Sequence, residues 1–176
     1  IGGEKNYDYR YAWTRDACLI IRAFTVVGAL EECKAAFSWL TKTILRHEGK
    51  VRVCYTLQGE FVPAETYPPL SGYKNSRPVR IGNNARDQQQ LSMYGDMLAT
   101  ALLFVRAGHI LDLTTARLLA GLANTCADTW KQADSGIWEL HDIQHYTHSK
   151  MACWINLDVA VYLAHECHLE KTWPER

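Results

Sequence analysis

Five apolar segments with helical spacing constrain the fold of this chain more than any other feature. They cover residues 14–27, 30–47, 87–107, 113–132 and about 150–167, and in each of them apolar side chains recur every three or four positions. Several segments are apolar over more than half of their circumference, which predicts helices that pack on two sides. Short turns alternate with long polar loops and no fixed repeat length appears, so the pattern indicates an all-α, two-layered helical toroid rather than a solenoid.

Turn and cap residues predict where these helices begin and end. Thr14 is expected to be the N-cap of the first helix, and Gly28 follows its last turn. Asp16 then falls in the first turn, where the helix dipole favours a carboxylate. Gly49 and Gly108 are expected to end the second and third helices.

Two segments between the helices have a different character. Residues 51–57 are short and β-branched, which predicts a strand. Residues 63–84 contain four of the five prolines and show no helical period. A loop of this length in a compact domain is usually a lid or a binding surface.

Composition excludes several classes of function. The 19 basic and 19 acidic residues balance, so no electrostatic signal favours nucleic acid or an anionic membrane as a partner. No apolar run is long enough to span a bilayer, and no cofactor motif is present. The six cysteines are scattered without a C-x-x-C pair, which indicates buried, reduced thiols and favours a cytoplasmic location. These cysteines are Cys18, Cys33, Cys54, Cys126, Cys153 and Cys167.

The stretch at 133–140 is the first candidate for chemistry. A helical run ends at Asp134, and an aromatic residue and a carboxylate follow at Trp138 and Glu139. A carboxyl group beside an indole at the end of an apolar helix is expected to be desolvated, which favours its protonated form. A general acid needs that environment. The alternative interpretation is a surface Glu beside a half-buried Trp.

Three blocks of sequence resemble those of glycoside hydrolase family 15, which contains glucoamylases, glucodextranases and trehalases. The blocks are YRYAWTRDA at 9–17, GYKNSRPVRIGN at 72–83, and GIWE at 136–139 with Ser149 and Lys150 shortly after. Their order and spacing match, and the resemblance covers essentially the whole chain. It implies an (α/α)6 barrel, of which residues 1–176 would form one partial catalytic domain, from the N-terminal to the middle part. The remainder of that domain would be needed to close the barrel.

The resemblance also implies an inverting reaction on α-glucosides with Glu139 as the general acid. Trp13, Arg15 and Asp16 would hold the non-reducing glucose, and a fork of N–H donors beside acceptor oxygens does suit vicinal hydroxyls. Trp138 would form a wall of the same subsite. The other implied substrate-binding residues are Arg77, Arg80, Tyr94 and Lys150, and His148 is a further candidate for the same pocket, as the alternative to a metal ligand.

Some positions depart from the family pattern. Ala12 and Thr14 follow the spelling of the fungal glucoamylases, but Leu140 stands where those enzymes have a second Glu. Asn75 stands where they have a Trp. The subsites beyond the first glucose are therefore not predicted by the resemblance.

An inverting mechanism also needs a second carboxylate, roughly 6.5–9.5 Å from the acid. In the family this base lies far towards the C-terminus of the barrel, so we expect it outside residues 1–176. Asp16, Asp87 and Asp142 are the nearest carboxylates in the chain, and none is assigned as the base.

Histidines at 141, 145 and 148 could suggest a metal site, since their spacings of four and three would place them on one face of a helix. No acidic residues accompany them at ligand spacing, so no metal is predicted. The expected substrate is an α-glucan, an oligosaccharide or trehalose, and the sequence does not choose among them. Two alternative functions remain open: a non-catalytic carbohydrate-binding or regulatory module, and a helical scaffold with an incidental pocket.

Overall fold

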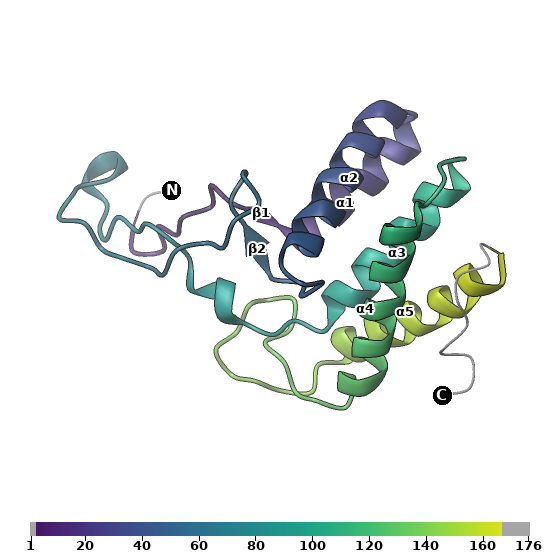
Figure 1. Cartoon of the computed structure of the whole chain (residues 1–176). Helices are drawn as coiled ribbons and strands as arrows, with labels where there is room; N and C mark the ends of the chain where they lie inside the picture. Colours follow the sequence, from purple (N-terminus) through teal and green to yellow (C-terminus); the bar gives the residue numbers. More distant parts are fainter. Residues whose placement is uncertain (1–2, 167–176) are drawn as a thin grey trace.

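The computed structural model describes residues 3–166, and within this range it contains five α-helices gathered on one side of the molecule (Figure 1). The all-α prediction is confirmed. No helix in this range combines the length and apolarity needed to cross a bilayer. The helices are α1 (Thr14–Val27), α2 (Leu30–Arg46), α3 (Ser92–Arg106), α4 (Leu113–Thr129) and α5 (Thr147–Glu166).

Short turns and long loops lie at opposite ends of the helices. The α1–α2 turn and the α3–α4 turn are both at the upper right of Figure 1, whereas the long loops 47–91 and 130–146 lie at the left and bottom. The N-terminal ends of α1, α3 and α5 therefore all point towards the loop side. This alternation brings segments that are far apart in sequence to one end of the molecule.

The main core lies between the helices, where α3 contacts α1, α4 and α5. Its fully buried members include Leu40, Met97, Leu98 and Leu119. The backbones of α3 and α5 approach each other closely at Gly95, because a Cβ atom built there would lie 2.4 Å from the carbonyl oxygen of Ala152. Only glycine permits this crossing.

The start of α1 differs from the prediction. The N-cap position is Trp13 and not Thr14. The reason is a short antiparallel pair, β1 (Ala12–Trp13) with β2 (Cys54–Tyr55), which holds Trp13 extended. Thr14 is the first helical residue, and its hydroxyl donates to the carbonyl of Arg52 at 2.6 Å. The predicted strand at 51–57 is thus confirmed over its central residues, and Gly28 ends α1 with φ 78° as expected.

The third helix begins later than predicted, so its expected start at residue 87 is wrong. A 3-10 turn, η2 (Asn84–Asp87), is followed by an extended stretch at 88–90, and α3 begins at Ser92. The last helix begins at Thr147, three residues earlier than expected, and Cys167 at its predicted end lies outside the described residues. The other five cysteines are free and buried, as predicted.

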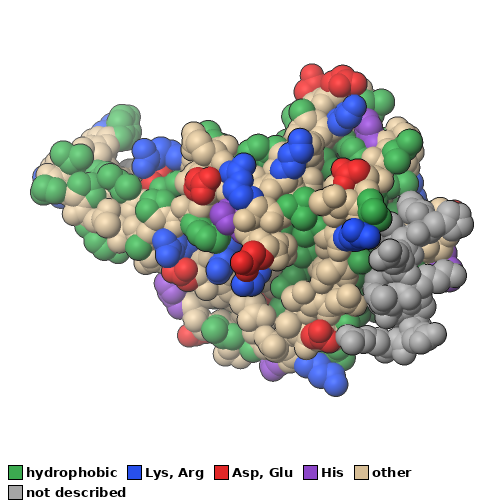
Figure 2. Space-filling view, in the orientation of Figure 1, with side chains coloured by type: hydrophobic (Ala, Val, Ile, Leu, Met, Phe, Trp, Pro, Cys, Tyr) green, Lys and Arg blue, Asp and Glu red, His purple; other side chains and the backbone are tan. Residues whose placement is uncertain are grey.

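Apolar side chains remain exposed on α1 and α5. Ile20 is 53% exposed and Trp154 is 66% exposed, on the sides of these helices that face away from the core. The predicted second packing side of these helices therefore has no partner among residues 3–166. The loop at 63–84 also carries exposed apolar side chains and forms the protrusion at the left of Figure 2.

Candidate active site

Two adjoining cavities lie on the loop side of the molecule. The first, of about 470 Å³, is lined by Trp13, Arg15 and Asp16 at the start of α1 and by residues 137–139. The second, of about 830 Å³, extends along the 63–84 loop and the segment before α3. Tyr9, Trp138 and Glu139 line both cavities, so the two form one continuous site with Glu139 at its junction.

The carboxyl group of Glu139 is held by two donors from the start of α1. Trp13 Nε1 donates to Glu139 Oε1 at 2.7 Å, and Arg15 Nη2 donates to the same oxygen at 3.4 Å. The side chain of Glu139 is 25% exposed. Trp138 is 80% exposed, so the indole that contacts the carboxyl is Trp13 and not its neighbour in sequence. Trp138 instead lines the open side of both cavities.

Arg15 joins the start of α1 to the 134–140 turn. Its Nη1 donates to the carbonyl of Ile137 at 3.2 Å, and to Gln90 Oε1 at 3.4 Å. Its Nη2 is shared between Glu139 and Asp16 Oδ2, the latter at 3.1 Å. The Asp16 side chain is 56% exposed, so of this ion pair the carboxylate is the member accessible to a ligand.

A buried carboxylate anchors the turn that carries Glu139. Asp134 is fully buried, and its Oδ2 accepts from Leu91 N and from Ser149 Oγ, each at 2.8 Å. Leu91 precedes α3 and Ser149 lies in the first turn of α5, so two helix N-termini converge on one negative charge. The backbones of Asp134 and Gln144 also form a bridge that closes the loop behind the site.

Arg80 forms the far wall of the larger cavity. Its Nη1 donates to Glu65 Oε1 at 2.5 Å, and its guanidinium lies 4.8 Å from the ring centroid of Tyr7 and 5.3 Å from that of Tyr67. The Glu65 side chain is only 4% exposed. The 63–84 loop thus contributes the ring of Tyr67 and the Arg80–Glu65 ion pair to the larger cavity.

Four predicted substrate-binding residues do not line either cavity. Arg77 donates to Ser71 Oγ at 2.8 Å on the protruding loop. His148 is exposed on α5 and lies near Asp96. Tyr94 packs against the core, and burial raises its pKa. Lys150 donates to the carbonyls of Trp130 and Gln132 beyond the end of α4, which is a structural contact.

Asp8 was not predicted as a site residue, and it fastens the N-terminal loop to the site. Its carboxylate accepts from Arg10 at 2.7 Å and from the backbone N–H of Gly82 at 3.0 Å, and its carbonyl accepts from Asn83. The Arg10 guanidinium, together with the Gly82 N–H and the Tyr11 hydroxyl, holds the pKa of Asp8 well below its usual range. The signal in the sequence was an Asp two residues before an Arg inside a block rich in tyrosine.

Gln88 and Gln90 were also missed, because the periodicity suggested a helix there. Gln88 Nε2 donates to the carbonyl of Glu139 at 3.1 Å, and Gln90 Nε2 donates to Gln88 Oε1 at 3.1 Å. Gln90 is 1% exposed. The three consecutive glutamines carry neither a charge nor a hydrophobic period, so the sequence held no signal for either residue.

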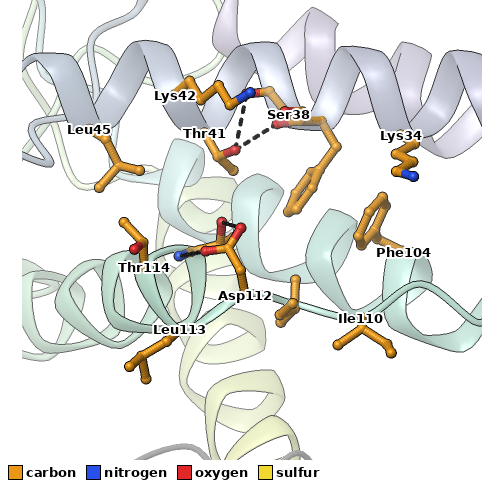
Figure 3. A pocket seen from close by; sticks show the side chains of 13 residues that line it. Lys34, Ser38, Thr41, Lys42, Leu45, Phe104, Ile110, Asp112, Leu113 and Thr114 are labelled. Atoms are coloured by element: carbon orange, nitrogen blue, oxygen red, sulfur yellow. Dashed lines mark hydrogen bonds between the residues drawn. The ribbon is translucent and has the colours of Figure 1, made fainter.

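A third hollow, of about 630 Å³, lies at the opposite end of the helices, between α2 and the α3–α4 turn (Figure 3). Phe104 and Ile110 line it, and Lys34 and Lys42 come from α2. Asp112 is the one carboxylate among its lining residues, and it caps α4 by accepting from Thr115 N at 2.8 Å. The hollow therefore has no carboxylate free for chemistry.

The described residues contain no group of three or more His, Cys, Asp or Glu side chains arranged for a metal ion. His141 and His145 lie in the loop before α5, so they do not share a helix face with His148. What the site presents is a carboxyl group held by indole and guanidinium donors among tyrosine and tryptophan rings. Such a pocket suits a polar ligand with flat apolar faces, and a sugar ring is a ligand of this kind.

Comparison with known proteins identifies the family. The sequence profile of glycosyl hydrolases family 15 matches residues 3–173, and the chain belongs to this family. It is 35% identical to a trehalase of Mycolicibacterium smegmatis, over 99% of this chain and 27% of that protein. It is 32% identical to a trehalase of Thermoplasma acidophilum, over 96% of this chain and 29% of that protein.

A trehalase of Mycobacterium tuberculosis is 33% identical to the chain, over 99% of this chain and 26% of that protein. The chain therefore spans between a quarter and a third of the length of these curated relatives. No solved structure matches it.

Proposed function

We propose that the full-length protein hydrolyses an α-glucosidic bond with inversion, that its substrate is trehalose, and that Glu139 is the general acid. Family membership and the relatives named trehalase support the reaction class and the substrate. The position of Glu139 at the junction of the two cavities supports its role, because a bond spanning the junction would lie beside its carboxyl group.

The contacts of the two carboxyl oxygens carry this assignment. Oε1 accepts from Trp13 Nε1 and Arg15 Nη2, whereas no residue in the range 3–166 forms a hydrogen bond with Oε2. A proton on Oε2 leaves Oε1 as the acceptor for both donors, so the acid form keeps the same contacts. Oε2 is then the atom that protonates the glycosidic oxygen as the bond breaks.

The base is proposed to come from outside residues 1–176. Three carboxylates line the cavities besides Glu139, and each forms an ion pair with an arginine: Asp16 with Arg15, Glu65 with Arg80, and Asp87 with Arg86. A carboxylate beside a guanidinium places acceptors and donors side by side, which suits vicinal sugar hydroxyls. We therefore propose that these three groups hold the sugar and do not act as the base.

The test uses the full-length protein with trehalose, maltose and isomaltose, and follows the anomeric protons by NMR. Early in trehalose hydrolysis, equal amounts of α- and β-glucose are expected from an inverting enzyme, and only trehalose should turn over efficiently. Glu139→Gln should lower kcat on trehalose by at least about 100-fold, the lower range for loss of a general acid. Glu48→Gln is the matched control, since that residue follows the end of α2, lines neither cavity, pairs with Lys50 and has a side chain that is 81% exposed.

No turnover of any α-glucoside by the wild-type protein would overturn the proposal. Binding of trehalose without turnover would indicate a non-catalytic carbohydrate-binding module. Retained turnover in Glu139→Gln would leave the reaction in place and overturn the assignment of the acid.

A further inference from the structure

The three consecutive glutamines at 88–90 form an extended stretch between η2 and α3. Alternate side chains of an extended chain point to opposite sides. Gln88 and Gln90 accordingly meet each other and the 134–140 turn, while Gln89 bonds outward to Gln132 at 3.0 Å. The amides of Gln88 and Gln90 therefore lie on the same side of the extended stretch, and that side faces the backbone of the proposed acid.

Gln88 and Gln90 complete a closed ring of hydrogen bonds that passes through Arg15 and Glu139. Arg15 Nη1 donates to Gln90 Oε1, Gln90 Nε2 donates to Gln88 Oε1, and Gln88 Nε2 donates to the carbonyl of Glu139. The ring returns through Glu139 Oε1, which accepts from Nη2 of the same guanidinium. Arg15 thereby holds the carboxyl directly and, through two amides, the backbone behind it.

The direction of these bonds is determined at both ends. A guanidinium only donates and a backbone carbonyl only accepts, so each amide between them must turn its oxygen towards Arg15 and its nitrogen towards Glu139. No flipped arrangement satisfies the ring. A glutamate at 90 would keep the acceptor for Arg15 but would place an oxygen against Gln88 Oε1.

One member of the ring, Glu139, has a strained backbone. Glu139 has φ 56°, a left-handed conformation that is unfavourable for a residue with a side chain. Such a conformation persists only where several contacts from the surrounding structure hold it in place, and residues of this kind cluster at functional sites. Gln88 on the Glu139 carbonyl and Arg15 on the Ile137 carbonyl restrain this turn from the α3 and α1 sides.

We propose that Gln88 and Gln90 are positioning residues for the general acid: the amide pair holds the strained turn so that Glu139 Oε2 meets the glycosidic oxygen. This inference rests on the proposed function. Neither glutamine need touch the substrate for this role, because both act through the backbone of Glu139 and the guanidinium of Arg15. A positioning role predicts that kcat falls most on substrates whose leaving group must be protonated as the bond breaks.

The experiment compares two substrates in the full-length protein. Trehalose has a poor leaving group that requires the acid, whereas α-glucosyl fluoride releases fluoride with little acid assistance. In Gln90→Leu, kcat on trehalose should fall by about 10- to 100-fold, a part of the 10²- to 10⁴-fold that general acid catalysis supplies. Turnover of α-glucosyl fluoride should stay within about threefold. Gln90→Glu keeps the size of the buried side chain and should show the same split, which guards against a folding defect in the leucine variant.

Gln132→Leu is the matched control. It makes the same substitution and removes an amide–amide hydrogen bond of 3.0 Å, but on the outer side of the stretch, and should change neither rate. Equal losses on both substrates in the Gln90 variants would indicate a merely structural role and overturn the proposal, as would no loss on either. If the wild-type protein turns over neither substrate, the proposed function falls together with this inference. If the wild type is active and the split is absent, this inference alone falls.

Discussion

Replacement of Asp134 by Ala is expected to release the turn that carries Glu139. The change removes the acceptor of two hydrogen bonds and leaves the buried N–H of Leu91 without a partner. A bond to a charged acceptor contributes about 1.5–3 kcal/mol, and an unsatisfied buried donor costs about 1–3 kcal/mol. Because these contributions overlap, the expected cost is about 3–4 kcal/mol, close to that of breaking a buried charged pair.

Asp134→Asn is the sharper comparison, because both donors use the same oxygen. An amide oxygen in the place of Oδ2 keeps both bonds, and its nitrogen replaces Oδ1, which is already buried without a partner, so the number of unpartnered buried side-chain atoms does not change. What Asn loses is the negative charge between two helix N-termini, a loss of about 1 kcal/mol. The two variants therefore separate the hydrogen bonds from the charge.

Hydrogen exchange of the full-length protein, followed by mass spectrometry, measures this difference locally. Peptides that contain the Leu91 amide should exchange about 100- to 1,000-fold faster in Asp134→Ala, since each 1.4 kcal/mol corresponds to a factor of ten. In Asp134→Asn the increase should be about fivefold. Similar rates in the two variants would refute the reasoning, because the charge and not the hydrogen bonds would then hold the turn.

Two further predictions concern the donors and the loop at the site. Trp13→Phe removes the 2.7 Å bond to Glu139 and should lower kcat on trehalose about tenfold or more. Trp39→Phe loses a 3.3 Å bond to the carbonyl of Leu57, and since neither residue lines the two cavities it should not lower kcat; equal kcat values in the two variants would contradict the role of Trp13. The lowered pKa of Asp8 means that its contribution to stability is complete above the unfolded value of about 4 and is lost as the pH falls towards the folded value. On going from pH 6 to pH 3, Tm should therefore fall about 2–4 °C further in the wild-type protein than in Asp8→Asn, and parallel Tm curves would contradict this.

The helices were predictable because their signals are local. Apolar spacing and the glycine at 28 located α1 and its end, and the proline-rich composition of 63–84 identified a loop that forms one wall of the site. The errors arose where a distant segment decided the conformation. Pairing with β2 made Trp13 the cap of α1, and nothing in the local sequence near Thr14 reports that partner.

The site was predicted in its centre and less well at its edges. Trp13, Arg15 and Glu139 do meet, although Trp13 binds the carboxyl group in place of Trp138. Glutamines at 88–90 showed no signal, since amide side chains carry neither a charge nor a hydrophobic period, and their contacts depend on a chain direction that only the fold determines. Lys150 illustrates the opposite case, in which a charged residue beside the site is used to bind carbonyl groups beyond the end of a helix.

The crossing at Gly95 has a consequence for how new specificities could arise. Where two helices touch through main-chain atoms, no side-chain repacking can slide one past the other, so a sequence change in the 63–84 loop leaves the angle between α3 and α5 as it was. Loop grafts from other family members should therefore alter the shape of the cavity that the loop lines, while α3 and α5 keep their relative position.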